Sequence, residues 1–560
     1  MSTPTSIQEP ATHTYLQIHP ADNVLVALQD LAAGATLVHH GQVIVLPGLV
    51  RAKHKVATEA LAAGAPVHMY GVQVGKTTQP IALGEVITSA NVQHEAEAYG
   101  LDRRQAWTWQ PPDVSAWQNT TFQGYPRTDG TVGTRNYWLV VPLVFCENRN
   151  IRMMQDAFER ALGYGQTDRY HQQVQQLAEA YRAGCLVDLS DPLPVATEQP
   201  ASRSALFPNV DGIKFLTHEM GCGGTAADAQ RLCDVLAGFI TNPNVGGVTV
   251  LSLGCQKSQL GMLQAAIAAR SPAFDRPVLY FNHQTYGTEA ELLTAAIGQT
   301  FRGLVQLNQQ TRQPAPLAKL NIGLKCGGSD GFSGISANPA VGYLSDVLVT
   351  LGGTTLLAEF PELCGVEQEL INRCVHEHDA QQFVHLMDSY AAQAAAVGAG
   401  FDMNPSPGNI KDGLITDAIK SAGAAKKGGY APVAGVLDYA EKPVRPGLHL
   451  LCTPGNDVLA TTGMAASGAT LILFTTGLGT PTGNPITPTV KISTNTRLAA
   501  RMPDLIDFDA GPIVAGAETI AENGERLLHW LVGLASGQYL TKAEQLGQDD
   551  FIPWQRDVNL

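Results

Sequence analysis

The sequence predicts a multidomain protein that begins with a small, mostly β domain and continues with α/β domains built on parallel sheets. Three observations support this fold class. The chain has 560 residues, too many for one hydrophobic core, so we expect about two to four domains. Residues 1–100 carry short β-like runs separated by glycine and proline turns. From residue 124 onward the chain repeats strand–loop–helix units.

Residues 1–100 form the first predicted domain. Their β-like runs cover residues 15–18, 43–46, 67–70 and 86–88, and a helix-like run at residues 21–31 interrupts them. Short strands at this spacing, bounded by turn residues, are typical of a small β domain. Residues 107–123 hold three tryptophans and a Pro-Pro pair with little periodicity. We therefore expect residues 101–123 to be an extended linker that lies on a surface.

Residues 124–312 form the second predicted domain. Apolar β-rich runs at residues 137–141, 213–216 and 247–253 each lead into a loop, and helical patterns follow near residue 151 and at residues 225–239 and 260–269. Repeated units of this kind indicate a parallel sheet with crossover helices. Residues 165–207 are polar, and we expect them to be an insertion over the surface.

Residues 313–560 form the last predicted domain. The segment at residues 309–316, rich in glutamine and proline, marks its start. Runs at residues 320–325, 354–358, 449–452 and 470–474 look like buried strands, so we expect a second α/β domain.

Composition excludes several classes of protein. The formal net charge is −14 and no Lys/Arg-rich block occurs, which argues against nucleic acid or an acidic membrane as a partner. No apolar run approaches the length of a membrane span, and residues 1–14 are polar, unlike a signal peptide. Nine widely spaced cysteines favour metal binding or catalysis in a reducing cytoplasm over a disulfide framework.

Five loops carry a cysteine beside glycine or polar residues. Three of these loops directly follow predicted strands, where an α/β enzyme places its chemistry. Another holds a thiol four residues after His218, and a thiolate with a nearby imidazole suits iron or zinc. Taken singly, each loop is equally well explained as a tight turn with an incidental thiol. No Cys-x-x-Cys pair occurs, so this is not a zinc-finger pattern. The five are Cys146, Cys222, Cys255, Cys326 and Cys364.

Two further loops have the composition of a ligand site. Residues 325–339 contain four glycines and three serines, together with Lys325, Asp330 and Asn338, and then enter a helix-like run. Backbone amides and hydroxyls at a helix start suit an anionic or polyhydroxylated ligand. Residues 475–485 form a similar hydroxyl-rich loop. Neither a P-loop nor a Gly-x-Gly-x-x-Gly motif occurs, so nucleotide binding is poorly supported.

At these loops the sequence resembles the altronate/galactarate dehydratase family. The resemblance rests on residues 124–136, 145–149, 218–224, 254–255, 325–339 and 359–362, and in the first domain on residues 19–24, 53–57 and 70–71. It covers nearly the whole chain. It implies an N-terminal β-clip (SAF-like) domain followed by Rossmann-like α/β domains. The polar insertion at 165–207 and the tail at 542–560 carry none of these motifs.

The resemblance also implies a metal-dependent dehydration of a sugar acid, with Fe(II) as the usual activator and Mn(II) or another divalent metal as the alternative. The acid loses its C2 proton and C3 hydroxyl, and the enol becomes a 2-keto-3-deoxy acid. A cation and fixed donors must stabilise the enediolate, a base removes the proton, and a divalent metal bridges carboxylate and α-hydroxyl.

Candidate residues fill each of these roles without a unique assignment, and we expect them to gather in one cavity around one cation. The candidate metal ligands are Cys146, His218, Cys222, Cys255, Glu359 and Cys364. The candidate carboxylate clamps are Arg135, Arg149 and Lys325, and Ser329, Asp330, Ser333 and Asn338 are candidate partners of sugar hydroxyls. The base is a lysine of lowered pKa (Lys257 or Lys325) or a histidine (His19, His54 or His218).

Several alternatives stay open. D-altronate, which would give 2-keto-3-deoxy-D-gluconate, is the first substrate, galactarate the second and sulfolactate a third. The loop thiols also allow a hydro-lyase with an iron–sulfur cluster. A non-catalytic sugar-acid-binding protein is the remaining alternative. We expect a cytoplasmic homodimer.

Overall fold

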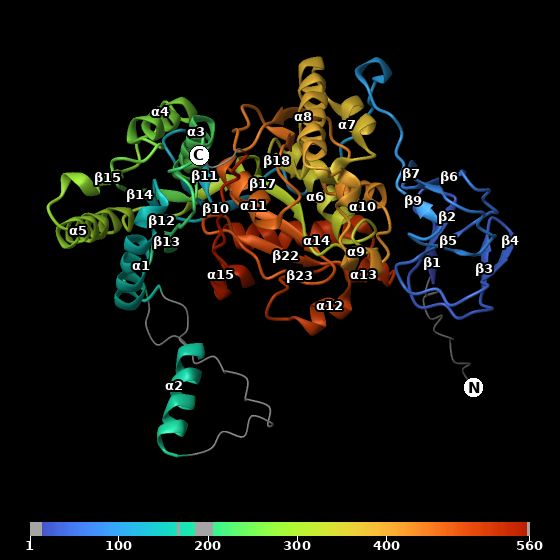
Figure 1. Ribbon diagram of the computed structural model, residues 1–560, viewed down its shortest axis with the longest axis horizontal. Helices are drawn as coiled ribbons and strands as arrows, with labels where there is room; N and C mark the ends of the chain where they lie inside the picture. The colour runs from blue at the N-terminus through green and yellow to red at the C-terminus, as the bar shows by residue number, and fades with distance from the viewer. Residues whose placement is uncertain (1–13, 165–168, 185–204, 557–560) are drawn as a thin grey trace.

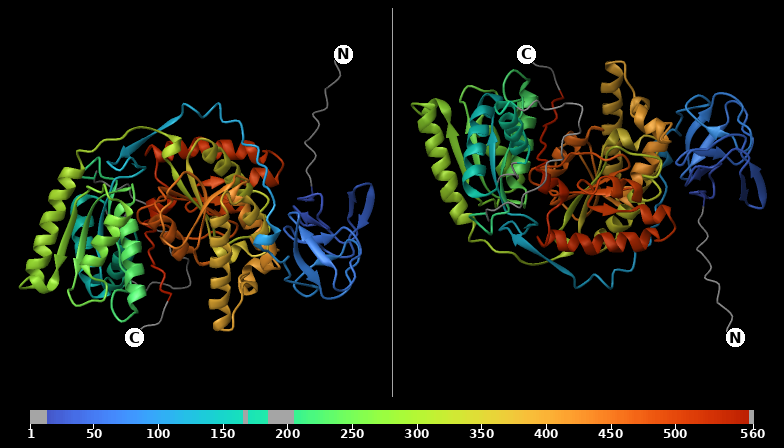
Figure 2. Two further views of the ribbon diagram at one scale, coloured as in Figure 1. Left: turned by 90° about the horizontal axis from the view of Figure 1, so that it is seen from above. Right: turned by 90° about the horizontal axis from the view of Figure 1, so that it is seen from below.

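The computed structural model describes residues 14–164, 169–184 and 205–556. Figure 1 shows three bodies in a row, with the N-terminal β domain at one end, the second domain at the other and the C-terminal domain between them. The chain crosses from the first body to the second along the outside of the central one, as Figure 2 shows. The predicted multidomain α/β fold with a small N-terminal β domain is confirmed.

The N-terminal domain consists of antiparallel strands. One sheet has the order β1-β2-β5-β8, a second β6-β7-β9, and β3 and β4 form a hairpin. The two-residue loops His40-Gly41 and Tyr70-Gly71 have positive φ at both positions, as type I′ hairpin turns require. The strands are β1 (Tyr15–Leu16), β2 (Val24–Ala27), β3 (Thr36–His39), β4 (Gln42–Val45), β5 (Lys55–Ala57), β6 (Pro66–Met69), β7 (Val72–Thr77), β8 (Val86–Ile87) and β9 (Val92–Gln93).

The expected helix at residues 21–31 is wrong. Residues 24–27 form β2, which pairs with β1 on one side and β5 on the other. All four of its residues are buried. Valine at two of these positions favours a strand that is covered on both faces.

The linker packs against the C-terminal domain. Trp107 donates a hydrogen bond to the Tyr430 carbonyl, and Trp117 is buried and donates to Glu525 at 2.6 Å. From Thr121 the chain is already strand β10 (Thr121–Pro126), which pairs with β16 (Gln313–Pro316) and with the short β11 (Val132–Gly133).

The second domain has a four-stranded parallel sheet of order β13-β12-β14-β15. Every residue of β12 and β14 is buried, which explains their continuous apolar pattern. The insertion contributes helix α2, and residues 165–168 and 185–204 lie outside the described part. The strands are β12 (Tyr137–Pro142), β13 (Gly212–Phe215), β14 (Val245–Ser252) and β15 (Val278–Asn282); the helices are α1 (Asn148–Leu162), α2 (Arg169–Arg182), α3 (Ala226–Thr241), α4 (Leu260–Arg270) and α5 (Glu289–Leu307).

The C-terminal domain has a seven-stranded parallel sheet of order β19-β20-β18-β17-β21-β22-β23. The chain builds outward from β17 in one direction through β18 and in the other through β21. The topological switch point therefore lies between β17 and β21, where an open α/β sheet binds its ligand. The strands are β17 (Asn321–Cys326), β18 (Thr354–Ala358), β19 (Val433–Leu437), β20 (Gly447–Leu451), β21 (Leu471–Thr476), β22 (Thr489–Ser493) and β23 (Phe508–Asp509).

Ten helices within the described residues of this domain surround the sheet. They are α6 (Ala337–Thr350), α7 (Glu367–Arg373), α8 (Glu377–Ala396), α9 (Pro407–Lys411), α10 (Asp417–Ala425), α11 (Asp457–Ala466), α12 (Thr496–Arg501), α13 (Gly511–Val514), α14 (Ile520–Ala535) and α15 (Lys542–Leu546). Among residues 14–164, 169–184 and 205–556, no helix combines the length and the apolar character needed to cross a membrane.

Helices α3 and α11 join the second and C-terminal domains. A Cβ at Gly238 in α3 would lie 2.3 Å from the Ala466 carbonyl in α11, so only glycine permits this approach. Asn242 at the end of α3 donates to the carbonyls of Ala465 and Ala469. Two helices therefore stand between the two parallel sheets.

Candidate active site

A buried group of charged side chains lies at the carboxyl ends of β17 and β18, beside the switch point of the C-terminal sheet. Cys326 ends β17, and Glu359 and Glu362 directly follow β18. The ligand atoms of these three residues all lie within 4.8 Å of one another. They are 1%, 1% and 4% exposed.

Three lysines pair with these groups. Lys325 Nζ lies 2.6 Å from Glu359 Oε1 and 2.8 Å from Asp457 Oδ1. Lys420 Nζ lies 2.9 Å from Glu362, and Lys427 Nζ donates to Cys326 Sγ at 2.7 Å. We call these residues the ionic cluster. Its members are Lys325, Cys326, Glu359, Glu362, Lys420, Lys427 and Asp457.

Burial and neighbouring charges shift the titration of the cluster. Burial alone would lower the pKa of Lys325, but Glu359 and Asp457 together raise it well above its ordinary value. The neighbouring carboxylates therefore favour the charged form of Lys325. The expectation that it is a base of lowered pKa is wrong.

The acidic members behave differently from one another. Burial and the charge of Glu362 raise the pKa of Glu359 to about 7. Burial also acts on Glu362, but Lys420 and Lys325 hold its pKa well below the ordinary value. Burial, followed by the Glu362 charge, raises the pKa of the Cys326 thiol to about 12.

Glu359 has two unusual features. Its φ is +72°, a left-handed conformation that costs about 1–2 kcal/mol for a residue with a side chain and that is concentrated at functional sites. Its Oε2 atom is buried and has no hydrogen-bond partner among the described residues. An unsatisfied buried carboxylate oxygen beside a thiol and a second carboxylate is a suitable donor set for a borderline divalent metal. The residues present therefore fit a metal ion.

The predicted sugar-binding residues of the 325–339 loop instead stabilise that loop. Asp330 is fully buried, accepts from Ser333 and Thr494, and lies 2.9 Å from Lys53 of the N-terminal domain. The Ser329 carbonyl accepts from Asn409. Asn338 donates to the Gly423 carbonyl and accepts from Thr475. The side chains of Asp330, Ser333 and Asn338 are therefore used inside the protein.

The remaining candidates of the first and last domains lie outside the cluster. His19 Nδ1 accepts from the backbone of Ala21 within its own turn. His54 Nε2 lies 3.2 Å from the Lys411 carbonyl, at the contact between the two domains. Cys364 Sγ lies 3.9 Å from His94 Nε2, and it is not among the three grouped donors.

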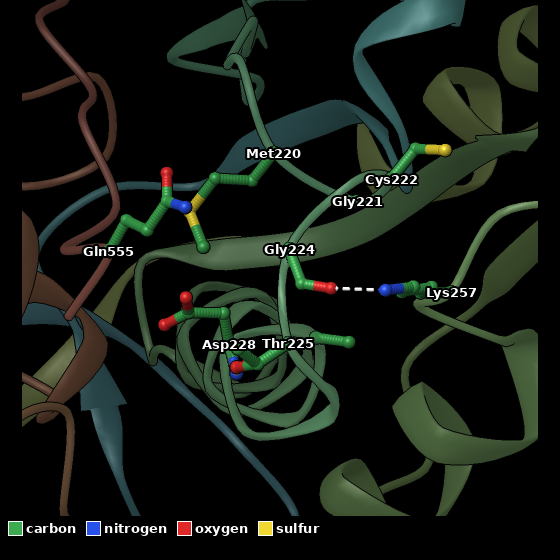
Figure 3. A pocket seen from close by; sticks show the side chains of 9 residues that line it. Met220, Gly221, Cys222, Gly224, Thr225, Asp228, Lys257 and Gln555 are labelled. Atoms are coloured by element: carbon green, nitrogen blue, oxygen red, sulfur yellow. Dashed lines mark hydrogen bonds between the residues drawn. The ribbon is translucent and has the colours of Figure 1, made fainter. Parts of the chain in front are cut away.

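The other predicted metal ligands lie on the second domain. Cys146, Cys222 and Cys255 are exposed and follow β12, β13 and β14. Lys257 lies beside them and donates to the Gly224 carbonyl, as Figure 3 shows. Because α3 and α11 separate the two sheets, these thiols and the ionic cluster occupy two places. The expectation of one cavity around one cation is wrong.

His218 supports the backbone of the Cys222 loop. Its Nδ1 accepts from the Met220 amide at 3.1 Å, and its Nε2 donates to the Pro142 carbonyl at 2.9 Å. With both ring nitrogens engaged, it is neither a metal ligand nor a base. Burial lowers its pKa to about 4.

Replacing His218 by glutamine is expected to reduce the pH dependence of stability. The unfolded state takes up a proton near pH 6.5 and the folded state only near pH 4, so the stabilisation is complete above pH 6.5 and is lost as the pH falls. The loss between pH 7.5 and 5 is about 2 kcal/mol. Urea unfolding of the parent protein and of His218→Gln at pH 7.5 and pH 5 measures this loss of stability. An equal pH dependence in both proteins would contradict the assignment.

The predicted arginine clamps have other partners. Arg135 is fully buried and forms a two-pronged ion pair with Glu544, with the shorter contact at 2.7 Å. Arg149 is exposed and pairs with Glu289. Neither contacts the ionic cluster, so we assign them no role in substrate binding.

Sequence reasoning missed four members of the cluster. Glu362 stands three residues after Glu359. Two carboxylates so close together after a predicted buried strand could have identified Glu362 as a candidate ligand. Asp457 opens helix α11. Lys420 and Lys427 come from α10 and the turn after it, and no local pattern marks them.

Known proteins match the chain along nearly its whole length. Residues 13–95 match the altronate/galactarate dehydratase SAF domain, residues 124–308 the second domain of D-galactarate dehydratase/altronate hydrolase, and residues 317–559 the C-terminal domain of D-galactarate/altronate dehydratase. An altronate dehydratase of Bacillus subtilis is 33% identical over 94% of this chain and 95% of its own. An altronate dehydratase of Escherichia coli is 33% identical over 94% of this chain and 95% of its own. A galactarate dehydratase (L-threo-forming) of Escherichia coli is 31% identical over 96% of each chain.

Proposed function

Because the chain belongs to the D-galactarate/altronate dehydratase family, we propose that it is a sugar-acid dehydratase that reacts at the ionic cluster. The proposed reaction converts D-altronate to 2-keto-3-deoxy-D-gluconate and water. Two altronate dehydratases at 33% identity, against 31% for a galactarate dehydratase, support this order of substrates. Galactarate is the alternative.

The observation that carries the proposal is the buried Oε2 of Glu359, which has no partner among the described residues and lies beside a fixed ammonium group at the carboxyl ends of β17 and β18. Cys326, Glu359 and Glu362 would hold a divalent metal, with Fe(II) as first choice and Mn(II) as second. Such an ion, when bound, supplies Lewis-acid polarisation of the substrate carboxylate and α-hydroxyl.

The chain's own residues supply the remaining chemistry. Removal of the C2 proton places negative charge on the substrate carboxylate, and we assign the stabilisation of this charge to the Lys325 ammonium. Burial strengthens this electrostatic interaction by excluding water. Asp457 is 31% exposed and stands at the open end of the cluster, so we assign it the role of the base that takes the C2 proton and passes it to the departing C3 hydroxyl. The C3 hydroxyl leaves as water, and the enol tautomerises to the keto acid.

An anaerobic assay with added Fe(II) tests this function. Altronate, galactarate and sulfolactate are supplied in parallel. Formation of 2-keto-3-deoxy acid is measured for the two sugar acids, and release of sulfite with pyruvate is measured for sulfolactate. We expect the highest kcat/KM on altronate and loss of turnover with a chelator. Folded, iron-loaded protein that converts none of the acids, or that binds one without turnover, would contradict the proposal. Faster conversion of galactarate would replace altronate as the substrate.

The cellular setting also belongs to the proposal. All eight described cysteines are free, which supports a reducing cytoplasm. The homodimer remains a prediction.

A further inference from the structure

Three solvent-exposed thiols lie at the carboxyl edge of the second domain's sheet, outside the ionic cluster. Cys146, Cys222 and Cys255 follow the three adjacent parallel strands β12, β13 and β14. They are the exposed cysteines among the described residues, whereas Cys233 of the same domain is buried in α3. Exposed free thiols are uncommon, because cysteine is among the most buried residue types. We call these three residues the thiol edge.

Backbone hydrogen bonds fasten the three loops to one another. The Phe145 amide donates to the Met220 carbonyl at 3.0 Å, and the Lys257 amide donates to the Gly221 carbonyl at 2.9 Å. Ser258 Oγ donates to the Leu143 carbonyl at 2.6 Å. The donor and the acceptor of each bond are at most three residues from a cysteine. The folded backbone therefore fixes the three cysteine-bearing loops relative to one another.

Glycines permit this close approach. Gly221 has φ +103°, and a Cβ there would lie 2.5 Å from the Leu143 carbonyl. Gly254, directly before Cys255, has φ +118°. A side chain at Gly221 would force the Cys222 loop away from the Cys146 loop, and one at Gly254 would collide with Asn282 and Gln284. Glycine at these two positions therefore lets the cysteine-bearing loops adopt their observed paths.

The thiols also interact electrostatically. Cys222 and Cys255 both lie close enough to Cys146 to act on it electrostatically. The three thiols therefore share one neighbourhood at the edge of the sheet.

The spacing of the sulfurs distinguishes two kinds of metal centre. One tetrahedral ion with bonds of about 2.3 Å requires sulfurs about 3.8 Å apart. Within the described residues, the group of three donors that all lie within 4.8 Å is Cys326, Glu359 and Glu362. At least one pair of sulfurs in the thiol edge is therefore more than 4.8 Å apart. A cluster, which gives each thiolate an iron of its own, suits such a spread.

We propose that Cys146, Cys222 and Cys255 hold an iron–sulfur cluster of the [4Fe–4S] type at the carboxyl edge of the second domain. Three protein thiolates leave the fourth iron without a cysteine. Its outer position faces solvent and suits a small oxygen ligand, as open coordination positions do at catalytic metals.

Neighbouring groups fit this assignment. Lys257 lies next to the thiols, and its ammonium offsets part of the negative charge of a thiolate-bound cluster. Figure 3 shows Cys222 pointing away from Asp228 and Gln555, on the other side of a cavity of about 10 Å³. That cavity holds no more than about one water molecule, so the space for a cluster lies on the solvent side.

Buried Glu147, which accepts from His283 and Asn150, fixes the turn directly after Cys146.

Anaerobic reconstitution of the full chain with Fe(II) and sulfide tests the proposal. Acid-labile sulfide, iron and visible absorption are measured per chain. We expect about four sulfides per chain and the broad visible absorption of a cluster. Cys146→Ala, Cys222→Ala and Cys255→Ala should each lose most of the sulfide and colour while keeping the thermal unfolding midpoint.

Two control variants make the result specific. Cys233→Ala removes a buried thiol of the same domain, and Cys326→Ala removes the thiol of the ionic cluster; both should retain the sulfide. Iron or zinc bound without sulfide would overturn the proposal, as would a cluster that survives in all three thiol-edge variants. The readout does not depend on turnover, so its failure is distinct from failure of the dehydratase assay.

Discussion

Replacing Lys325 by methionine is expected to lower the kcat of sugar-acid dehydration by about 10²–10³-fold, the usual cost of removing one fixed donor that faces developing negative charge. The reason lies in the two carboxylates beside it. Glu359 at 2.6 Å and Asp457 at 2.8 Å keep Lys325 charged, and methionine retains the length of the side chain without its charge. Because Glu359 titrates near neutrality, it can take up a proton in the variant, which limits the cost to folding.

Lys491→Met is the matched control. Lys491 is buried in the same sheet, and its Nζ lies 5.2 Å from the centre of the Phe474 ring, which the Lys325 ammonium approaches to 5.4 Å. Its other contacts are the Thr482 carbonyl and Gln548, not the carboxylates. Steady-state kinetics and thermal unfolding of both variants should show loss of kcat in Lys325→Met alone. Equal kcat values in the two variants would remove Lys325 from the mechanism.

Replacing Arg135 by methionine is expected to lower the free energy of unfolding by about 3–5 kcal/mol, because removing one partner leaves a buried charge uncompensated. Arg135 is fully buried, pairs with Glu544 and also donates to the Leu534 carbonyl at 3.0 Å. Folded enzyme should keep its KM, since the guanidinium lies away from the ionic cluster.

Arg149→Met provides the comparison. Its side chain is 67% exposed and pairs with Glu289, so its loss should cost at most about 1 kcal/mol. Denaturant unfolding of Arg135→Met and Arg149→Met measures the free energy of unfolding, and steady-state kinetics over a range of substrate concentrations measures KM. A raised KM with unchanged stability in Arg135→Met would restore the substrate-clamp interpretation.

The parallel sheets were predictable because their strands are continuous apolar runs that end at glycine-rich loops. The runs at residues 137–141, 247–253 and 354–358 correspond to β12, β14 and β18. The error at residues 21–31 has a tertiary cause: β2 is stabilised by strands on both sides, and a local pattern does not show its neighbours.

The candidate site was predictable only in part. Sequence named Lys325 and Glu359 as candidates and placed Cys326 among the loop thiols, but it did not include Cys326 among the metal ligands. From the sequence, all the loop thiols are expected in one site. The predicted boundary at residue 313 already places Cys146, Cys222 and Cys255 in a different domain, and so on a different sheet, from Cys326 and Cys364. The partner of Arg135 lies 409 residues further along the chain, and both hydrogen bonds of the His218 ring are with backbone atoms. These interactions form only in the folded protein, so no short sequence pattern predicts them.

The pairing of β10 with β16 has a consequence for the architecture as a whole. The chain enters the second domain at the end of one of these strands and leaves it at the start of the other, so both crossings lie side by side. A body attached through two adjacent crossings leaves a gap that a single short connection can close. Removing it would still expose the contact between α3 and α11 and leave Glu544 without Arg135, so the two units are joined by packing more than by the chain.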